Sequence, residues 1–183
     1  MSAGLLAGLL ITTLLVTVIW IFNRLVRDRN QVAAAWSDID VQLQKRHDLI
    51  PPLVEILRGY ASHERELLER VTRERTQSRG THGIESRGEI ERALGQDLSR
   101  LVALAEAYPD LKASQNFSQL NTELVKVEDH LQYARRFYNG SVRQFNDRIQ
   151  VFPHVLVARS FGFREAEFFD APDAATAAPQ VNL

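Results

Sequence analysis

The sequence predicts an all-α protein, in which a single N-terminal transmembrane helix precedes a long antiparallel helical bundle of three main helices plus a short fourth, with a disordered C-terminal tail. Three observations support this class. The chain opens on a long uncharged apolar stretch, apolar residues then recur at steps of three and four, and no stretch alternates as a β-strand does. The predicted boundaries are 1–23 for the anchor, 24–170 for the bundle and 171–183 for the tail.

The anchor is predicted from the first 23 residues, which carry no charged side chain. The twenty mostly apolar residues from Ala3 to Phe22, at about 1.5 Å per residue, span the ~30 Å of a bilayer core. A cleaved signal peptide is the alternative, but it would carry its basic residues before the apolar run. Here the basic residues follow the run and Trp20 stands near that end, so we favour a retained anchor with these membrane-flanking residues: Trp20, Arg24, Arg27 and Arg29.

The same arginines predict the orientation of the chain. Positively charged flanks tend to stay in the cytoplasm, so the N-terminus is expected outside and the bundle inside. The lipid bilayer is therefore the first expected partner.

The first helix of the bundle is expected from near Arg24 to near Ser78, with a kink at Pro51 and Pro52. A second helix is predicted over residues 89–108, where Pro109 ends it, and Ser114 is placed to cap a third helix. The third helix is expected to continue to about residue 152, and Pro153 opens the short fourth. Long apolar faces joined by brief turns bury each other by folding back into a bundle.

Composition excludes several classes of protein. The chain has 22 Lys and Arg against 23 Asp and Glu, a balance that predicts no nucleic-acid partner. It has no Cys, which excludes disulfides, thiol catalysis and Cys-based metal sites. The Glu-x-x-His pairs of di-iron bundles are absent, and Leu67 stands where a zincin helix would place its second His after His63. We predict no enzyme, no metal and no cofactor; an unrecognised hydrolase or metal enzyme is the least favoured alternative.

Polar residues on the apolar faces are the candidates for specific contacts. Asp40 and His47 share a helix face with Arg46 beside them, and in a bundle such residues more often fix helix register than catalyse a reaction. Asn139 and Asn146 lie seven residues apart on one face of the third helix. Because a buried Asn needs a partner, we expect these two to pair with Asp40, Arg46 or His47 on the first helix.

Three segments of the sequence resemble the LemA family of bacterial membrane proteins. The most specific motifs are AW-x-x-IDVQL-x-x-R-x-DLIP (35–51), P-x-L-x-A (109–113) and RRFYN-x-x-V (135–142). The resemblance covers the anchor and the chain up to about residue 170, and it departs from the usual pattern at Pro52, where the family has a polar residue such as Asn. It implies one helix in the bacterial inner membrane and a long helical bundle without established catalytic residues. It also suggests an accessory role near a membrane zinc peptidase or another envelope protein.

The predicted function is that of a membrane-anchored, non-enzymatic scaffold or interaction protein that self-associates. An accessory subunit or adaptor of a membrane-bound peptidase or envelope stress system is the alternative. The expected contact residues come from the first and third helices: Trp36, Ile39, Asp40, Leu43, Arg46, His47, Pro51, Pro52, Arg135, Tyr138, Asn139 and Asn146.

Overall fold

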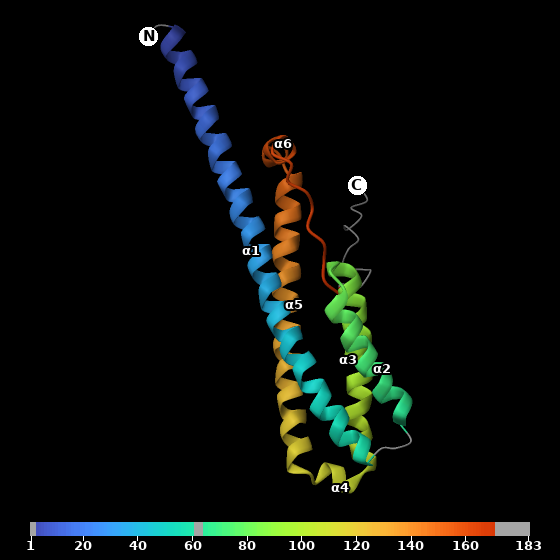
Figure 1. Cartoon of the computed structure of the whole chain (residues 1–183). Helices are drawn as coiled ribbons and strands as arrows, with labels where there is room; N and C mark the ends of the chain where they lie inside the picture. Colours follow the sequence, from blue (N-terminus) through green and yellow to red (C-terminus); the bar gives the residue numbers. More distant parts are fainter. Residues whose placement is uncertain (1–2, 61–63, 171–183) are drawn as a thin grey trace, which may run out of the picture.

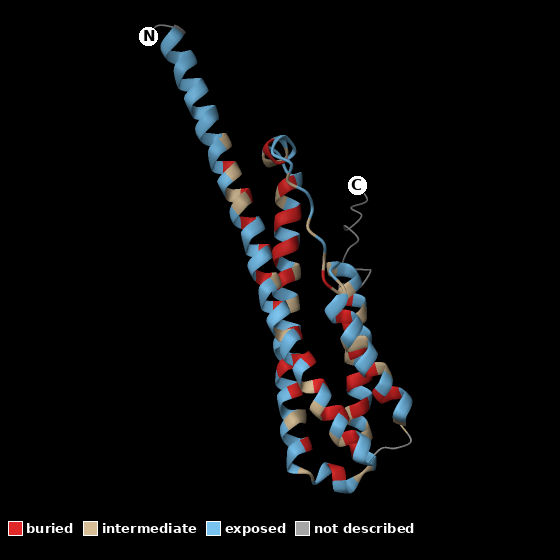
Figure 2. Cartoon of the chain, viewed as in Figure 1, coloured by how far each residue is buried: buried red, intermediate tan, exposed pale blue. Residues whose placement is uncertain are grey.

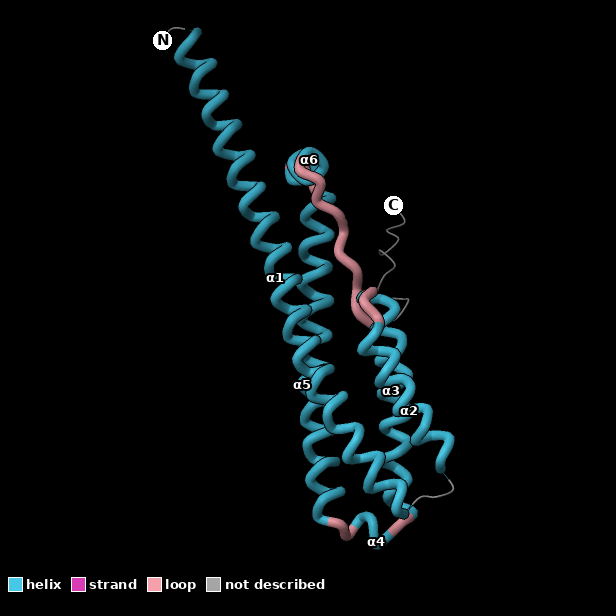
Figure 3. The backbone as a smooth tube through the Cα atoms, viewed as in Figure 1, coloured by secondary structure: helices cyan, strands magenta, loops and turns pink. Residues whose placement is uncertain are grey.

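The computed structural model describes residues 3–60 and 64–170, and every regular element in these ranges is a helix (Figures 1 and 3). This confirms the predicted all-α class. The predicted tail, 171–183, lies outside the described residues. The described chain contains one helix, at the N-terminus, that is long and apolar enough to cross a membrane.

Helix α1 (Ala3–Tyr60) runs through both Pro51 and Pro52. The prediction of one helix that continues to near Ser78 is wrong, because helix α2 (Arg65–Gly80) is a separate element that packs back against α1. Leu67 of α2 joins the same apolar cluster as Leu57 of α1. The spacing of apolar residues is the same in a long helix and in a helical hairpin, so periodicity alone does not separate the two.

The remaining helices follow the predicted order. Helix α3 (Ile84–Leu104) begins five residues earlier than expected and passes into a short turn, η2 (Ala105–Ala107). Helix α4 (Pro109–Lys112) connects it to helix α5 (Gln115–Gln150), at whose start the Ser114 hydroxyl accepts a hydrogen bond from the Phe117 amide, as predicted. Helix α6 (His154–Ser160) follows Pro153.

The helices form an elongated antiparallel bundle (Figure 1). Helix α5 packs along the middle of α1 and buries its apolar face, including Ile39 and Leu43. Helices α2 and α3 pair with each other beside the last part of α1 and form a second core with Leu57 and Leu94. The face of α1 that follows the apolar stretch is thus covered by α5.

The first part of α1 extends beyond the bundle. Most of its residues are exposed, and Figure 2 shows it as a pale blue rod without neighbours among the described elements. Burial begins at the end of the apolar segment, where Ile21 and Leu25 enter the α1–α5 core. A helix that shows large apolar side chains on all sides over this length is typical of a membrane span.

Candidate interaction site

Four polar residues are buried where α1, α2 and α3 meet, and we call Arg46, His47, Ser78 and Glu91 the polar centre. Each residue is at most 1% exposed. The Glu91 carboxylate accepts hydrogen bonds from Arg46 Nη1 at 3.2 Å, from His47 Nε2 at 2.7 Å and from the Ser78 hydroxyl. Charges this deeply buried are stable only when paired, so the four residues depend on one another.

The environment of Glu91 favours its ionised form. Burial raises the pKa of this carboxyl group, but hydrogen bonds from His47 and Ser78 and the charge of Arg46 outweigh burial and lower the pKa below its ordinary value. Glu91 is therefore held as a carboxylate that binds side chains from two other helices.

Arg46 extends the polar centre to a fourth helix. Its Nη2 atom lies 3.4 Å from Glu128 Oε2 of α5. The guanidinium reaches this position because Gly95 of α3 has no side chain: a Cβ there would lie 2.5 Å from Arg46 Nη2. Arg46 thus joins α1 to both α3 and α5.

After α6 the chain returns along the bundle as an extended segment, residues 161–170, which we call the strap (Figure 3). Asn146 donates to the Ala166 carbonyl at 3.0 Å and accepts from the Ala166 amide at 2.9 Å. Asn139 makes the same pair of bonds with Phe169, at 2.9 and 3.0 Å. Each amide side chain thus satisfies both backbone groups of one strap residue, as a neighbouring β-strand would.

These bonds correct the expected partners of the two asparagines. The prediction that they pair with Asp40, Arg46 or His47 is wrong. Arg46 and His47 are bonded to Glu91. The error arose because a backbone partner leaves no mark in the side-chain pattern of the sequence.

The end of the strap is fixed by an aromatic and an acidic residue. Phe169 is fully buried, and its ring centroid lies 5.4 Å from that of Trp36. Asp170 forms an ion pair with Arg135 Nη1 at 2.6 Å and a second with Arg92 of α3. The strap therefore connects α5 to α1 and α3.

Tyr138 of α5 and Gly88 of α3 are in close contact with the backbone of the strap. The Tyr138 hydroxyl donates to the Glu167 carbonyl at 2.8 Å, and burial raises the pKa of Tyr138 to about 12. Gly88 of α3 faces the strap, and a Cβ there would lie 2.7 Å from the Asp170 amide nitrogen. A side chain at position 88 would collide with the backbone of the strap.

The other predicted contact residues have different surroundings. Asp40 is exposed and pairs with Arg87 of α3 at 2.8 Å, separately from the polar centre. Pro51 is exposed and Pro52 is half-buried. The structure therefore places Arg46 and His47 together in the polar centre. Other predicted residues contact the strap: Trp36, Arg135, Tyr138, Asn139 and Asn146. The two prolines and Asp40 belong neither to the polar centre nor to the contacts of the strap.

The membrane-flanking residues lie near the start of the α1–α5 contact. Trp20 is exposed, and the Arg29 guanidinium lies 5.5 Å from the Phe163 ring centroid. Arg24 lies 3.7 Å from the buried carboxylate of Asp28, which also pairs with Arg148 of α5 at 2.6 Å. The Arg27 guanidinium donates to the carbonyl of Asn23 at 3.4 Å.

Sequence reasoning missed three acidic residues that hold the bundle together, namely Glu91, Asp28 and Asp170. Glu91 could have been found, because it extends the apolar series of Leu94, Leu98 and Leu101 by one step of three. A charged residue on a buried face predicts a buried partner. Asp170 gives no such signal, since its partners come from α3 and α5.

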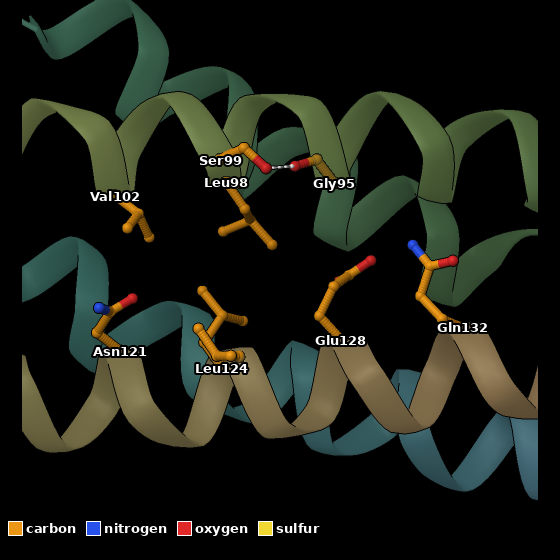
Figure 4. Close-up of a pocket in the computed structure, with 9 residues that line it drawn as sticks. Gly95, Leu98, Ser99, Val102, Asn121, Leu124, Glu128 and Gln132 are labelled. Atoms are coloured by element: carbon orange, nitrogen blue, oxygen red, sulfur yellow. Dashed lines mark hydrogen bonds between the residues drawn. The ribbon is translucent and has the colours of Figure 1, made fainter.

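A groove of about 350 Å³ lies between α3 and α5 (Figure 4). Its apolar lining includes Leu98 and Val102 of α3 and Leu124 and Val125 of α5, while Glu128 adds a polar side chain near the polar centre. Val125 is 52% exposed. An apolar floor with polar residues beside it is the arrangement that accepts an amphipathic helix.

Comparison with known proteins gives consistent matches over most of the chain. The model of the LemA family matches residues 35–183. Protein LemA of Metamycoplasma hominis is 30% identical over 156 residues, which cover 82% of this chain and 69% of that protein. Magnetosome protein MamQ 2 of Paramagnetospirillum magneticum is 24% identical over 200 residues, 93% of this chain and 74% of that protein. Magnetosome protein MamQ of Magnetospirillum gryphiswaldense is 26% identical over 200 residues, which cover 93% of this chain and 72% of that protein.

Proposed function

The chain belongs to the LemA family, and from this premise we propose that it is a membrane-anchored, non-enzymatic scaffold that associates with further copies of itself through the groove between α3 and α5. The family match and the relatives support a membrane-associated helical protein. The apolar stretch of α1 supplies the anchor.

The observation that carries self-association is the exposed apolar surface of the groove. Val125 stays half in water in the single chain, although Leu98 and Leu124 beside it are buried. A helix of a second copy that fills the groove would remove this surface from water, at roughly 25 cal/mol per Å². Anchoring raises the local concentration of copies in the membrane plane, so a modest contact area is enough to assemble them.

The proposal is non-enzymatic because the ionised residues of the site are used in joining helices. Arg46, Glu91 and Glu128 connect α1, α3 and α5, and Asp170 fastens the strap. These contacts support a rigid rod that presents surfaces to partners.

The test of self-association uses the full chain in detergent micelles, with size-exclusion chromatography and light scattering. We expect an oligomer for the natural chain. Val125→Glu should shift it to the monomer with unchanged helix content, because the substitution places a charge on the groove floor. Tyr133→Glu is the matched control, since Tyr133 is 67% exposed and does not line the groove. A natural chain that is monomeric at micromolar concentration overturns the proposal.

The proposed orientation places the bundle in the cytoplasm of a bacterial cell. It is supported by Arg24, Arg27 and Arg29, which follow the apolar stretch. The chain has no Cys, so a single Cys at the exposed position His82 is a clean reporter. We expect His82→Cys to react with a membrane-impermeant maleimide only after cells are opened. Reaction in intact cells would reverse the orientation and leave the anchor itself unaffected.

A further inference from the structure

The end of the bundle nearest the N-terminus carries a group of exposed apolar side chains. We call residues 151–161 the tip; they comprise the turn after α5, with Pro153, then α6 and Phe161. Phe152 is 78% exposed, Leu156 59% and Phe161 57%. Single exposed apolar residues are common on soluble proteins, but several large ones in so short a segment indicate a surface that something covers.

The tip lies beside the last turn of the apolar stretch of α1. The ring centroids of Phe161 and Phe22 are 4.9 Å apart, and those of His154 and Trp20 are 6.3 Å apart. Val18 and Phe22 already pack against the α1–α5 core. The bundle therefore meets α1 within the stretch that is predicted to span the bilayer, and not at the end of a free linker.

This contact fixes the height of the tip relative to the membrane. If residues 3–22 occupy the bilayer core, a helix packed against residues 18–22 lies at the boundary between the acyl chains and the headgroups. Trp20, on the same level, has the side chain that is enriched at this depth.

The orientation of α6 suits an interfacial position. Figure 1 shows α6 nearly end-on at the top of α5, whereas α1 and α5 are seen from the side. Helix α6 thus lies across the bundle axis, and a bundle that stands upright on its anchor would hold α6 parallel to the membrane surface. Amphipathic segments bind bilayers in this orientation, with the apolar side chains in the acyl region.

The charge around the tip favours an anionic surface. From Arg148 to Arg164 the chain has three Arg and neither Asp nor Glu. Arg24 and Arg148 share the buried Asp28, so the net positive charge near this level comes mainly from Arg27, Arg159 and Arg164. Basic residues near an anionic lipid surface each contribute roughly 1 kcal/mol of attraction. A patch with large apolar side chains and a net positive charge matches an anionic lipid surface in both respects.

We propose that the tip inserts into the headgroup and outer acyl region of an anionic bilayer next to the anchor, so that the bundle is held at the membrane by two adjacent contacts. The apolar side chains of Phe152, Leu156 and Phe161 enter the bilayer, while Arg159 and Arg164 bind lipid phosphates. This inference rests on the proposed anchor. A second contact with the bilayer limits the tilt of the bundle, which the single anchor helix alone would leave free.

The test measures the depth of the tip in liposomes that contain phosphatidylglycerol. Because the chain has no Cys, single Cys variants of the full chain can be labelled with the fluorophore NBD. Phe152→Cys and Leu156→Cys report on the tip, and Leu10→Cys, 70% exposed, reports on the anchor. Tyr133→Cys is the matched control, because Tyr133 is 67% exposed, between Leu156 and Phe152, and lies on α5 away from the tip. Lipids with a nitroxide on the acyl chain quench only labels that enter the bilayer.

We expect both tip labels to show blue-shifted emission and to lose most of their intensity to the lipid quencher, whereas the label at position 133 keeps its intensity. Quenching at position 10 without quenching at 152 and 156 overturns the tip insertion and leaves the anchor intact. No quenching at position 10 contradicts the anchor itself. Tip labels that shift to the blue only as the protein density rises, without lipid quenching, would assign the tip to a contact between copies and overturn the inference.

Discussion

Replacing Glu91 with Leu is expected to destabilise the bundle by about 3–5 kcal/mol, the cost of leaving a buried charge without its partner. Arg46 and His47 both bond to this carboxylate inside the protein, and each is only 1% exposed. Glu128 remains near Arg46, but it lies on the other side of the guanidinium and contacts Nη2. The leucine would also leave the Ser78 hydroxyl without its acceptor.

The measurement is urea unfolding of the full chain in micelles, followed by circular dichroism. Glu89→Leu is the matched control, because Glu89 lies on the exposed side of the same helix and a surface substitution changes stability by about 0.5 kcal/mol or less. Equal stability of the two variants would mean that the polar centre contributes nothing specific to the bundle.

The pH dependence of the free energy of unfolding provides a second test of the role of Glu91. Its pKa is lowered in the folded chain, so its contribution to stability is present above the ordinary glutamate pKa of about 4.3. This contribution is lost as the pH falls from that value through the lowered pKa of the folded state. The natural chain should therefore lose more stability on acidification than Glu91→Leu does, and parallel pH profiles would argue against an ionised Glu91.

The second large effect is expected from Phe169→Ala, which should release the strap. Phe169 is fully buried against Trp36, and replacing a buried Phe with Ala costs about 3–5 kcal/mol. The other apolar residues of the strap that pack against the core, Phe163, Ala166 and Phe168, are only partly buried, so the loss of Phe169 acts on the docking of the strap before it acts on the whole bundle. Even 3 kcal/mol corresponds to about a hundredfold increase in the open population.

The measurement is hydrogen exchange at the backbone amide of Ala166. This amide donates to Asn146 Oδ1 and belongs to a strap residue that the substitution does not change. We expect exchange there to speed up by about a hundredfold in Phe169→Ala, with unchanged exchange in the middle of α5. Glu167→Ala serves as the control, since this side chain is exposed. Unchanged exchange at Ala166 would show that the strap is held by Asn139 and Asn146 without help from Phe169.

Much of the fold could be predicted from the sequence because helices leave a local signal. The apolar stretch at 3–22, the apolar series of the first and third helices and the cap at Ser114 each reflect residues close together in the chain. The position where the first helix ends could not be predicted, because Leu67 and Val71 continue the same spacing after the reversal. Helix α1 ends at Tyr60, and the apolar face of α2 packs back against α1.

The candidate site was predictable only in part. Arg46 and His47 stood out as polar residues on an apolar face, and so did Asn139 and Asn146. Their partners did not, since Glu91 lies 44 residues beyond His47 and Phe169 lies 30 beyond Asn139. The groove between α3 and α5 also has no sequence signal, because it depends on the spacing of two helices that are only indirectly joined.

The sequence by itself thus determined the helical class, the apolar anchor and which residues face inward, since each of these follows from hydrophobic spacing along one helix. The tertiary structure decided which buried charges meet, where the strap returns and that the tip lies level with Trp20. The physical reason is distance along the chain. A buried Arg requires some acceptor, but only the packing of α1 against α3 selects Glu91 as that acceptor.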